Sequence, residues 1–458
     1  MSTKGIRDFR PKIHFTPPNM WMNDPNGMVY VDGNYHLFYQ KYPYSTGHGP
    51  MHWGHAVTKD LLHWEHKPIA LYPDELGMVF SGSCAYDREN TSGFGTAEHA
   101  PIVAIYTSHN GDTGLEQQSI AYSIDGGNHF EKSYLNPVIK NPGLSDFRDP
   151  KVFWNARHGC WSLVLAAYDR VQFYSSEDMK QWTKTGEFGL KENHASGVFE
   201  CPDLFPVAVD GKVLWVLLVS MTTTVEDGRS RTQYFVGEFD GDTFTCTYPA
   251  GEPLWLDFGF DNYAGVTFQN LEEPLLIGWA QNWEYSDRVP TDDFCSQMTL
   301  ARKLSLRKIG DNYRLCGKPE GIRQFQRQAY PIENSGRIRS ETFGIKIHGK
   351  GDAKLNLSNS RGQKLLIEIQ DDSVIVDRGM AGAKEFDETF MTEQYSRASV
   401  HRFITGEYDI EFIFDVSLLE LFADGGLEMC TMELYPDSPY DRVSWEGDLQ
   451  VEYYQILG

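Results

Sequence analysis

The stretch FYSSEDMKQW (173–182) and three similar stretches decide the fold. Each begins as an apolar strand, passes through a polar turn that contains an aspartate, and ends on an aromatic residue. The other copies are AVTKDLLHW (56–64), AYSIDGGNHF (121–130) and VGEFDGDTF (236–244). Their final aromatic residues are 66, 52 and 62 positions apart. This spacing is longer than one hairpin and suits a four-stranded propeller blade with long loops.

These four copies, with further strands around Leu275–Leu306, predict about five blades. From Met28 to Leu306 the chain consists of short apolar or aromatic runs broken by Gly, Asp, Asn and Pro, and helical periodicity is hard to find. A β-sandwich with coincidental turns is the alternative that the spacing leaves open. The expected fold class is all-β, with a five-bladed β-propeller over residues 1–316.

The pattern changes after about Pro319. The runs 364–379 and 408–426 resemble paired strands with tight turns, which predicts a separate C-terminal β-sandwich over 335–458 and a linker over 317–334. The sandwich could also join copies of the chain into a homo-oligomer. In the second run, alternation puts apolar residues on one face and polar residues on the other: Ile410, Phe412, Phe414 and Val416 against Glu411, Asp415 and Ser417.

Composition excludes several classes of partner. The 458 residues carry a net charge of −23, which repels nucleic acid and anionic lipid surfaces. No apolar run is long enough to span a bilayer, and the first residues lack the apolar core of a secretion signal. The seven cysteines are scattered, without a CxxC pair. This usage predicts reduced thiols and a cytoplasmic protein without a zinc site.

Three motifs place an acidic residue at or near a proline, on three different predicted blades. Alone, each acid is as typical of a solvated turn or strand end as of a site. Because the inner strands of a propeller converge on a central funnel, the three acids can meet there. Two carboxyl groups facing each other are the apparatus of a glycosidase. The motifs are WMNDPNG (21–27) with Asp24, DFRDP (146–150) with Asp149, and FECPD (199–203) with Glu200.

These motifs, in this order, resemble the signature of glycoside hydrolase family 32, which contains invertases, exo-acting levanases and inulinases, and sucrose-6-phosphate hydrolases. The resemblance covers nearly the whole chain and implies a five-bladed propeller followed by a β-sandwich. Further motifs that match the family pattern are YHLFYQ (35–40), MHWGHAVTKDLLHWEHKPIAL (51–71), FSGS (80–83), DFGFDNYA (257–264) and IGWAQNWEY (277–285).

The resemblance also implies residue roles. Asp24 is the expected nucleophile, and Glu200 is expected to protonate the leaving oxygen and then activate water. Asp149 is expected to bind fructose hydroxyls and stabilise the transition state, with Arg148 alongside. The expected fructose-pocket residues are Asn23, Gln40, Trp53, Phe80 and Ser81, with Tyr263 and Trp279 as further candidates.

No metal or other cofactor is expected. His52, His55, His63 and His66 form two HxxH pairs. Their segments have the pattern of strands and turns, where residues i and i+3 do not share a face. The expected small-molecule partner is a sugar substrate, sucrose or a fructo-oligosaccharide.

The leading hypothesis is a β-fructofuranosidase that releases terminal fructose from sucrose and short fructo-oligosaccharides with retention. A sucrose-6-phosphate hydrolase is the close alternative, with Lys41 as a candidate phosphate clamp, since YQKYPYS (39–45) departs from the family pattern after its YQ. An exo-levanase or exo-inulinase, and a catalytically inactive fructan-binding protein, are further alternatives.

Overall fold

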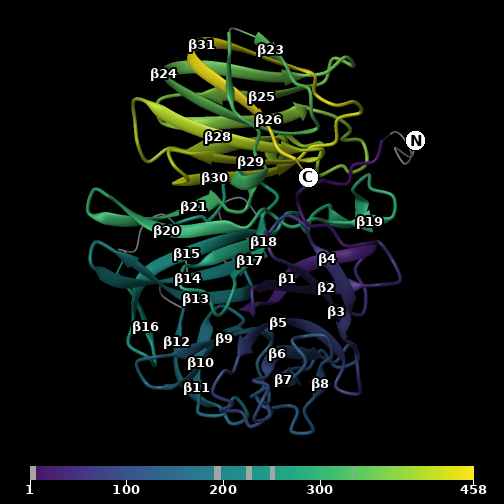
Figure 1. Ribbon diagram of the computed structural model, residues 1–458, viewed down its shortest axis with the longest axis vertical. Helices are drawn as coiled ribbons and strands as arrows, with labels where there is room; N and C mark the ends of the chain where they lie inside the picture. The colour runs from purple at the N-terminus through teal and green to yellow at the C-terminus, as the bar shows by residue number, and fades with distance from the viewer. Residues whose placement is uncertain (1–6, 190–196, 223–228, 248–252, 334, 458) are drawn as a thin grey trace.

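The computed structural model describes residues 7–189, 197–222, 229–247, 253–333 and 335–457 as two β domains. Figure 1 shows the C-terminal sandwich, in light green and yellow, stacked on the propeller. The described helices are short: η1 (Ser286–Arg288), η2 (Ile322–Phe325) and α1 (Glu393–Ser396). In the described part of the chain, no helix has the length and apolarity needed to cross a membrane. The predicted all-β fold is confirmed.

The four strands of each blade follow one another along the chain, and neighbours within a blade are antiparallel. Blade 1 consists of β1 (Met20–Val31), β2 (Asn34–Tyr42), β3 (His52–Thr58) and β4 (Glu65–Leu71). Blade 2 consists of β5 (Met78–Tyr86), β6 (Ile102–His109), β7 (Glu116–Ser123) and β8 (Glu131–Lys132). Blade 3 consists of β9 (Phe147–Asn155), β10 (Cys160–Ala167), β11 (Val171–Ser176) and β12 (Thr183–Phe188). Blade 4 consists of β13 (Phe199–Val209), β14 (Lys212–Met221), β15 (Arg231–Phe239) and β16 (Phe244–Cys246). Blade 5 consists of β17 (Tyr263–Thr267), β18 (Leu275–Trp279), β20 (Arg302–Ile309) and β21 (Asn312–Pro319).

The sequence repeat marks the turn between the third and fourth strands of blades 1 to 4. In each turn the aspartate side chain accepts hydrogen bonds of 2.7–3.1 Å from backbone N–H groups two to four residues further on. Such Asx turns reverse the chain with local polar bonds and need no neighbouring blade. The four aspartates are Asp60, Asp125, Asp178 and Asp240.

Near its start, the innermost strand of every blade contains one more residue than the stretch of strand beside it, and β1 has a second such shift between Asn26 and Val29. Such a β-bulge bends the strand and re-aims side chains, and it leaves one residue outside the hydrogen-bonded ladder. Proline is tolerated there because the missing N–H is not needed, which accounts for Pro25, Pro150 and Pro202. The five bulges near the strand starts lie between Met22 and Pro25, Val79 and Gly82, Arg148 and Lys151, Glu200 and Asp203, and Tyr263 and Val266.

The ring of blades is closed by a short strand from the last blade. β19 (Phe294–Cys295) pairs in parallel with the start of β1, and Met20 N–H donates to the Asp293 carbonyl at 2.7 Å. β19 lies in the connection between β18 and β20 of blade 5. The first and last blades are therefore joined by backbone hydrogen bonds as well as by packing.

The sandwich strands form one extended, antiparallel sheet system. Within the predicted linker 317–334, the end of β21 still belongs to blade 5, and β22 already pairs with β31. The strands are β22 (Tyr330–Ile332), β23 (Ser335–Arg337), β24 (Thr342–Ser358), β25 (Lys364–Ile369), β26 (Ser373–Met380), β27 (Arg397–His401), β28 (Tyr408–Asp415), β29 (Leu418–Ala423), β30 (Glu428–Glu433) and β31 (Arg442–Gln455).

Strand β28 shows the predicted alternation, with one difference. Its apolar face, with Ile410, Phe412 and Phe414, is buried in the sandwich core. The opposite face is also buried at its end, where Ile413 packs with propeller residues and Asp415 is fully inaccessible. The expectation of a half-buried strand is therefore wrong for this end, because the polar face meets the propeller instead of water.

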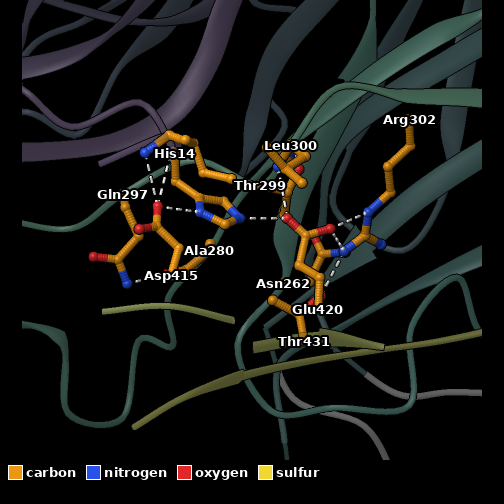
Figure 2. Close-up of polar contacts among 12 residues, drawn as sticks. His14, Asn262, Ala280, Gln297, Thr299, Leu300, Arg302, Asp415, Glu420 and Thr431 are labelled. Atoms are coloured by element: carbon orange, nitrogen blue, oxygen red, sulfur yellow. Dashed lines mark hydrogen bonds and ion pairs between the residues drawn. The ribbon is translucent and has the colours of Figure 1, made fainter. Parts of the chain in front are cut away.

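A buried polar network joins the two domains. Figure 2 shows the His14 ring between Asp415 and Glu420, with Arg302 beyond Glu420. The ring nitrogens lie 2.9 Å from Asp415 Oδ2 and 3.0 Å from Glu420 Oε1, and Arg302 Nε donates to Glu420 Oε2 at 2.9 Å. All four side chains are buried, so the segment before blade 1, blade 5 and the sandwich are held by charges that water does not screen.

Candidate active site

The innermost strands place the predicted site residues at the start of each blade. These strands are neighbours around the ring. Each site residue lies at or beside a bulge, and the bulge residues Asp149, Cys201 and Ala264 have φ angles of 65°, 44° and 53°. This left-handed backbone is unusual for residues with a Cβ and turns the neighbouring side chains. The residues presented are Asn23 and Asp24 from β1, Phe80 and Ser81 from β5, Arg148 and Asp149 from β9, Glu200 from β13 and Tyr263 from β17.

A cavity of about 480 Å³ opens among these strands. Its size is within the usual range for small-molecule sites. All three predicted catalytic acids line it. The lining residues are Asn23, Asp24, Gln40, His48, Phe80, Ser81, His109, Gly114, Glu116, Ser145, Asp146, Arg148, Asp149, Glu200 and Trp283.

Asp24 has one occupied and one free carboxylate oxygen. Its Oδ2 accepts hydrogen bonds from Ser81 Oγ at 2.7 Å and from Cys201 Sγ at 3.5 Å. Its Oδ1 has no hydrogen-bond partner among the described residues. The two bonds fix the orientation of the carboxylate, and the free oxygen keeps its lone pairs available for a reacting atom.

Glu200 is arranged to hold a proton at higher pH than an ordinary glutamate. Burial raises its pKa, whereas the charge of Arg148 and a hydrogen bond from Tyr263 act in the opposite direction; the net shift is upward. Tyr263 OH donates to Glu200 Oε2 at 2.5 Å, and Arg148 NH2 donates to Oε1 at 3.0 Å. Both oxygens are therefore positioned, and the raised pKa suits a general acid.

Arg148 is surrounded by carboxylates. Besides Glu200, it bonds Asp146 Oδ1 at 2.7 Å and Glu116 Oε1 at 3.1 Å through NH1. His109 in turn lies 3.1 Å from Glu116 Oε1 and stacks on Phe80, with ring centroids 4.2 Å apart. The guanidinium is thereby fixed in the cavity wall, beside the acid that it partly neutralises.

Asp149 lies close enough to the other two acids to be affected by their charges. Its Oδ2 accepts the Cys201 N–H at 3.0 Å, and its own N–H donates to Thr107 Oγ1 at 3.0 Å. Burial raises its pKa to about 8; Arg148 opposes this shift, and the charges of Glu200 and Asp24 add to it. A carboxyl group that titrates near neutrality can either accept a hydrogen bond from a sugar hydroxyl or donate one.

The structure separates the predicted sugar-binding residues into two groups. Asn23, Gln40, Phe80, Ser81 and Arg148 line the cavity. The other three are buried behind it. Trp53 Nε1 donates to the Phe80 carbonyl at 3.0 Å, Tyr263 supports Glu200, and Trp279 packs under Trp283 with ring centroids 4.7 Å apart.

Seven lining residues were not expected from the sequence: Gly114, Ser145, His48, Glu116, His109, Asp146 and Trp283. The last two lie within stretches that the sequence does single out, DFRDP and IGWAQNWEY. Trp283 follows the end of β18 at Trp279, where the chain turns, so strand alternation could not indicate which tryptophan reaches the cavity. His109 and Glu116 are on the second and third strands of blade 2, respectively, and only the register of that blade reveals them.

Comparison with known proteins decides the family. Residues 14–319 match the glycosyl hydrolases family 32 N-terminal domain, and residues 323–453 match the glycosyl hydrolases family 32 C-terminal domain. The chain belongs to glycosyl hydrolase family 32. The resemblance recognised in its motifs is thereby confirmed, and so is the expectation of a glycoside hydrolase.

Individual relatives of this family 32 chain span most or all of it. A levanase of Bacillus subtilis (strain 168) is 40% identical over 94% of this chain and 67% of its own length. An extracellular exo-inulinase of Aspergillus awamori is 33% identical over 98% of this chain and 94% of its own. An invertase of Schizosaccharomyces pombe is 42% identical over 66% of this chain and 54% of its own.

Solved structures of family 32 members match the fold over both domains. The crystal structure of exo-inulinase from Aspergillus awamori has a TM-score of 0.91 at 31% identity and covers 99% of each chain. A β-fructofuranosidase from Schwanniomyces occidentalis complexed with fructosyl-erythritol has a TM-score of 0.87 at 28% identity, covering 98% of this chain and 97% of its own.

Within the described residues, no cluster of three or more His, Cys, Asp or Glu is placed to hold a metal ion.

Proposed function

We propose that this family 32 member is a retaining β-fructofuranosidase that removes terminal fructose from sucrose and fructo-oligosaccharides. The observation that carries the proposal is the pairing of two unlike carboxyl groups in one cavity. Asp24 offers a free oxygen, and Glu200 has a raised pKa. The names of the relatives (levanase, exo-inulinase and invertase) support a fructoside as the substrate.

In the first half of the reaction, the carboxylate of Asp24 attacks the anomeric carbon of the terminal fructosyl unit. Glu200 gives its proton to the glycosidic oxygen as the bond to that oxygen breaks, so the leaving group departs as a neutral alcohol. The positive charge that develops on the fructosyl ring is stabilised by the neighbouring carboxyl groups. The product of this half is a fructosyl ester of Asp24.

In the second half, Glu200, now ionised, takes a proton from a water molecule that attacks the same carbon. The ester bond breaks, Asp24 regains its negative charge, and fructose leaves with its original anomeric configuration. Asp149, which lines the same cavity, is proposed to bond the sugar hydroxyls. Arg148 stabilises the ionised form of Glu200 between the two halves.

The charge of the cavity favours neutral substrates over sucrose-6-phosphate. Its described lining contains five carboxyl groups, and Arg148 is the one lysine or arginine among them. Lys41, the candidate phosphate clamp, is buried, does not line the cavity, and donates its ammonium to the Asn19 carbonyl. A phosphate dianion would therefore meet repulsion without a free cation to bind it.

Rates on sucrose, sucrose-6-phosphate, kestose, inulin and levan test the substrate. We expect activity on the neutral sugars and at least about tenfold lower kcat/KM on the phosphate ester. Glu200→Gln should lower kcat by about 10²–10⁴-fold. Equal, slow fructose release by the wild type and Glu200→Gln would instead indicate an inactive fructan-binding protein.

In aqueous methanol, retention predicts methyl β-fructofuranoside as the transfer product, and its α-anomer would contradict the double displacement.

A further inference from the structure

A row of aromatic rings lies on blade 1 beside the cavity. Tyr42 and Tyr44 have ring centroids 5.7 Å apart, Tyr44 and His52 are 6.1 Å apart, and His52 and Tyr72 are 5.5 Å apart. Every contact is edge-to-face, with interplanar angles of 75–80°. We call these four residues the aromatic row. The mechanism proposed above uses none of them.

The aromatic row is continuous with the cavity. Trp21 pairs with Tyr42, Gln40 with Trp53, and Trp53 with Leu71. The row therefore lies at the same end of blade 1 as Asn23 and Asp24. The ring of Tyr42 covers Gly49, where an added Cβ would lie 2.4 Å from the ring. Gly49 directly follows His48, which lines the cavity.

Two members of the aromatic row are open to solvent. Tyr44 is 72% exposed and Tyr72 is 54% exposed. Ring surface is therefore free for a ligand at both positions. Large exposed aromatic side chains in line with a binding cavity are typical of a ligand-binding surface.

The backbone beneath the aromatic row is fixed. Trp21 N–H donates to the Ser45 carbonyl at 2.9 Å, and His52 Nδ1 lies 2.9 Å from the Pro50 carbonyl oxygen. Lys132 of blade 2 donates to the Tyr72 carbonyl at 2.5 Å and to Asp74 at 2.6 Å. Because the backbone that carries these rings is held in place before a ligand arrives, binding would not have to pay for ordering of the main chain.

We propose that the aromatic row binds the distal units of a neutral fructan chain whose terminal unit occupies the cavity. The inference rests on the proposed function and extends it to polymeric substrates. Tyrosine rings offer apolar faces for sugar C–H groups and a hydroxyl for their polar edges. The net charge of −23 disfavours a nucleic acid on the same rings.

The test compares short and long substrates in Tyr44→Ala, Tyr72→Ala and the double variant. The double variant should lower kcat/KM on inulin or levan by about 5–20-fold, mainly through KM, since each lost aromatic contact is worth about a factor of 2–10. Its kcat/KM on sucrose should remain within about twofold of the wild type, because sucrose is too short to reach both rings. Tyr330→Ala is the matched control, since Tyr330 is 45% exposed on the sandwich strand β22.

A binding measurement separates failure of this inference from failure of the proposed function. In the Glu200→Gln background, the affinity for an inulin oligosaccharide should fall by a similar factor when both tyrosines are replaced, whether or not the wild type is active. Unchanged inulin affinity would overturn the proposal that the aromatic row binds a fructan chain. An equal loss on sucrose and inulin would also overturn it, because that result indicates damage to the cavity itself.

Discussion

Two groups of buried carboxylates, one in the cavity and one between the domains, have opposite surroundings. At the domain interface, Asp415 accepts three backbone N–H groups, the His14 ring and Thr342 Oγ1. Despite burial, hydrogen bonds and positive charges keep the pKa of Asp257, Asp415 and Glu420 below the usual range. In the cavity, burial raises the pKa of Glu200 and Asp149, and Asp24 keeps one unbonded oxygen.

The difference indicates how a buried acid is used. A carboxylate with every lone pair occupied stabilises the fold, and one left partly unsatisfied is available for chemistry. Asp261 and Glu433 are exceptions at the interface, because burial raises the pKa of both, and the charge of Asp261 adds to the shift of Glu433. Asp261 is raised although Arg378 bonds it at 2.7 Å. Glu433 accepts a hydrogen bond from Gln281 at its Oε1 at 2.9 Å. Its partners are neutral amides, which compensate a buried charge less than a guanidinium does. The following predictions test this contrast from the largest expected effect to the smallest.

Asp24→Asn should abolish activity without harming the fold. Without an anionic nucleophile, kcat should fall by about 10⁴-fold or more. The melting temperature should equal or exceed that of the wild type, because the change removes like-charge repulsion with Glu200 and Asp149. Fructose release and thermal unfolding measure the two effects. A large loss of stability would show that Asp24 belongs with the structural carboxylates.

Glu420→Gln should lower the stability of the fold and leave activity nearly unchanged. It removes one of the two carboxylates that each of Arg302 and His14 contacts in a fully buried site, which should cost about 3–5 kcal/mol of unfolding free energy. At temperatures well below melting, kcat/KM should stay within about twofold of the wild type, since Glu420 is not part of the cavity. Glu272→Gln, at an exposed position, is the control and should change stability by less than about 0.5 kcal/mol. Denaturant unfolding of all three proteins decides between the outcomes.

His14 should make the stability of the domain interface depend on pH. Burial alone would lower its pKa, but hydrogen bonds and charges from Asp415 and Glu420 outweigh burial and raise it to about 9 from 6.5. The folded pKa is above the unfolded one, so the stabilisation is complete below pH 6.5 and is lost as pH rises through 9. The loss amounts to roughly 3 kcal/mol.

The stability difference between the wild type and His14→Gln should accordingly shrink between pH 6.5 and 9 in urea unfolding. A difference that is constant over this range would mean that His14 is neutral in the folded protein.

Tyr263→Phe should move the pH profile of the reaction. The Tyr263 hydroxyl lowers the pKa of Glu200 by bonding its ionised form. Its removal should raise that pKa, so the basic limb of kcat/KM should move up by about one pH unit. A purely structural role would lower kcat and leave the limb in place. Trp215→Phe, in a distant part of blade 4, is a control that should not shift the profile.

Much of the fold could be predicted from the sequence because its turns are local. The aspartates of the four repeated stretches bond their own backbone, so the turn is encoded within about ten residues. The five bulges and β19 could not be predicted this way. They depend on the register between strands, and β19 pairs with a strand about 270 residues earlier in the chain.

The candidate site was predictable to the extent that its residues lie in motifs on the inner strands. Asp24, Asp149 and Glu200 all line the cavity, and each is marked by a proline at or near the bulge. Glu116 carries no such mark, since it reaches the cavity only because β6 and β7 lie beside β5. Trp53 was expected to touch sugar, but an aromatic residue next to a site can equally well support its wall.

The connections that close this molecule also set an order for its synthesis. The inner edge of blade 1 stays open until Phe294 and Cys295 have left the ribosome, because β19 is its partner. His14 can form its contact with Asp415 only later still, because Asp415 lies 401 residues further along the chain. At about 5–20 residues per second, this interval lasts roughly 20–80 s. Until β19 emerges, the nascent chain carries an unpaired strand edge, which is a feature that promotes aggregation and calls for protection by chaperones.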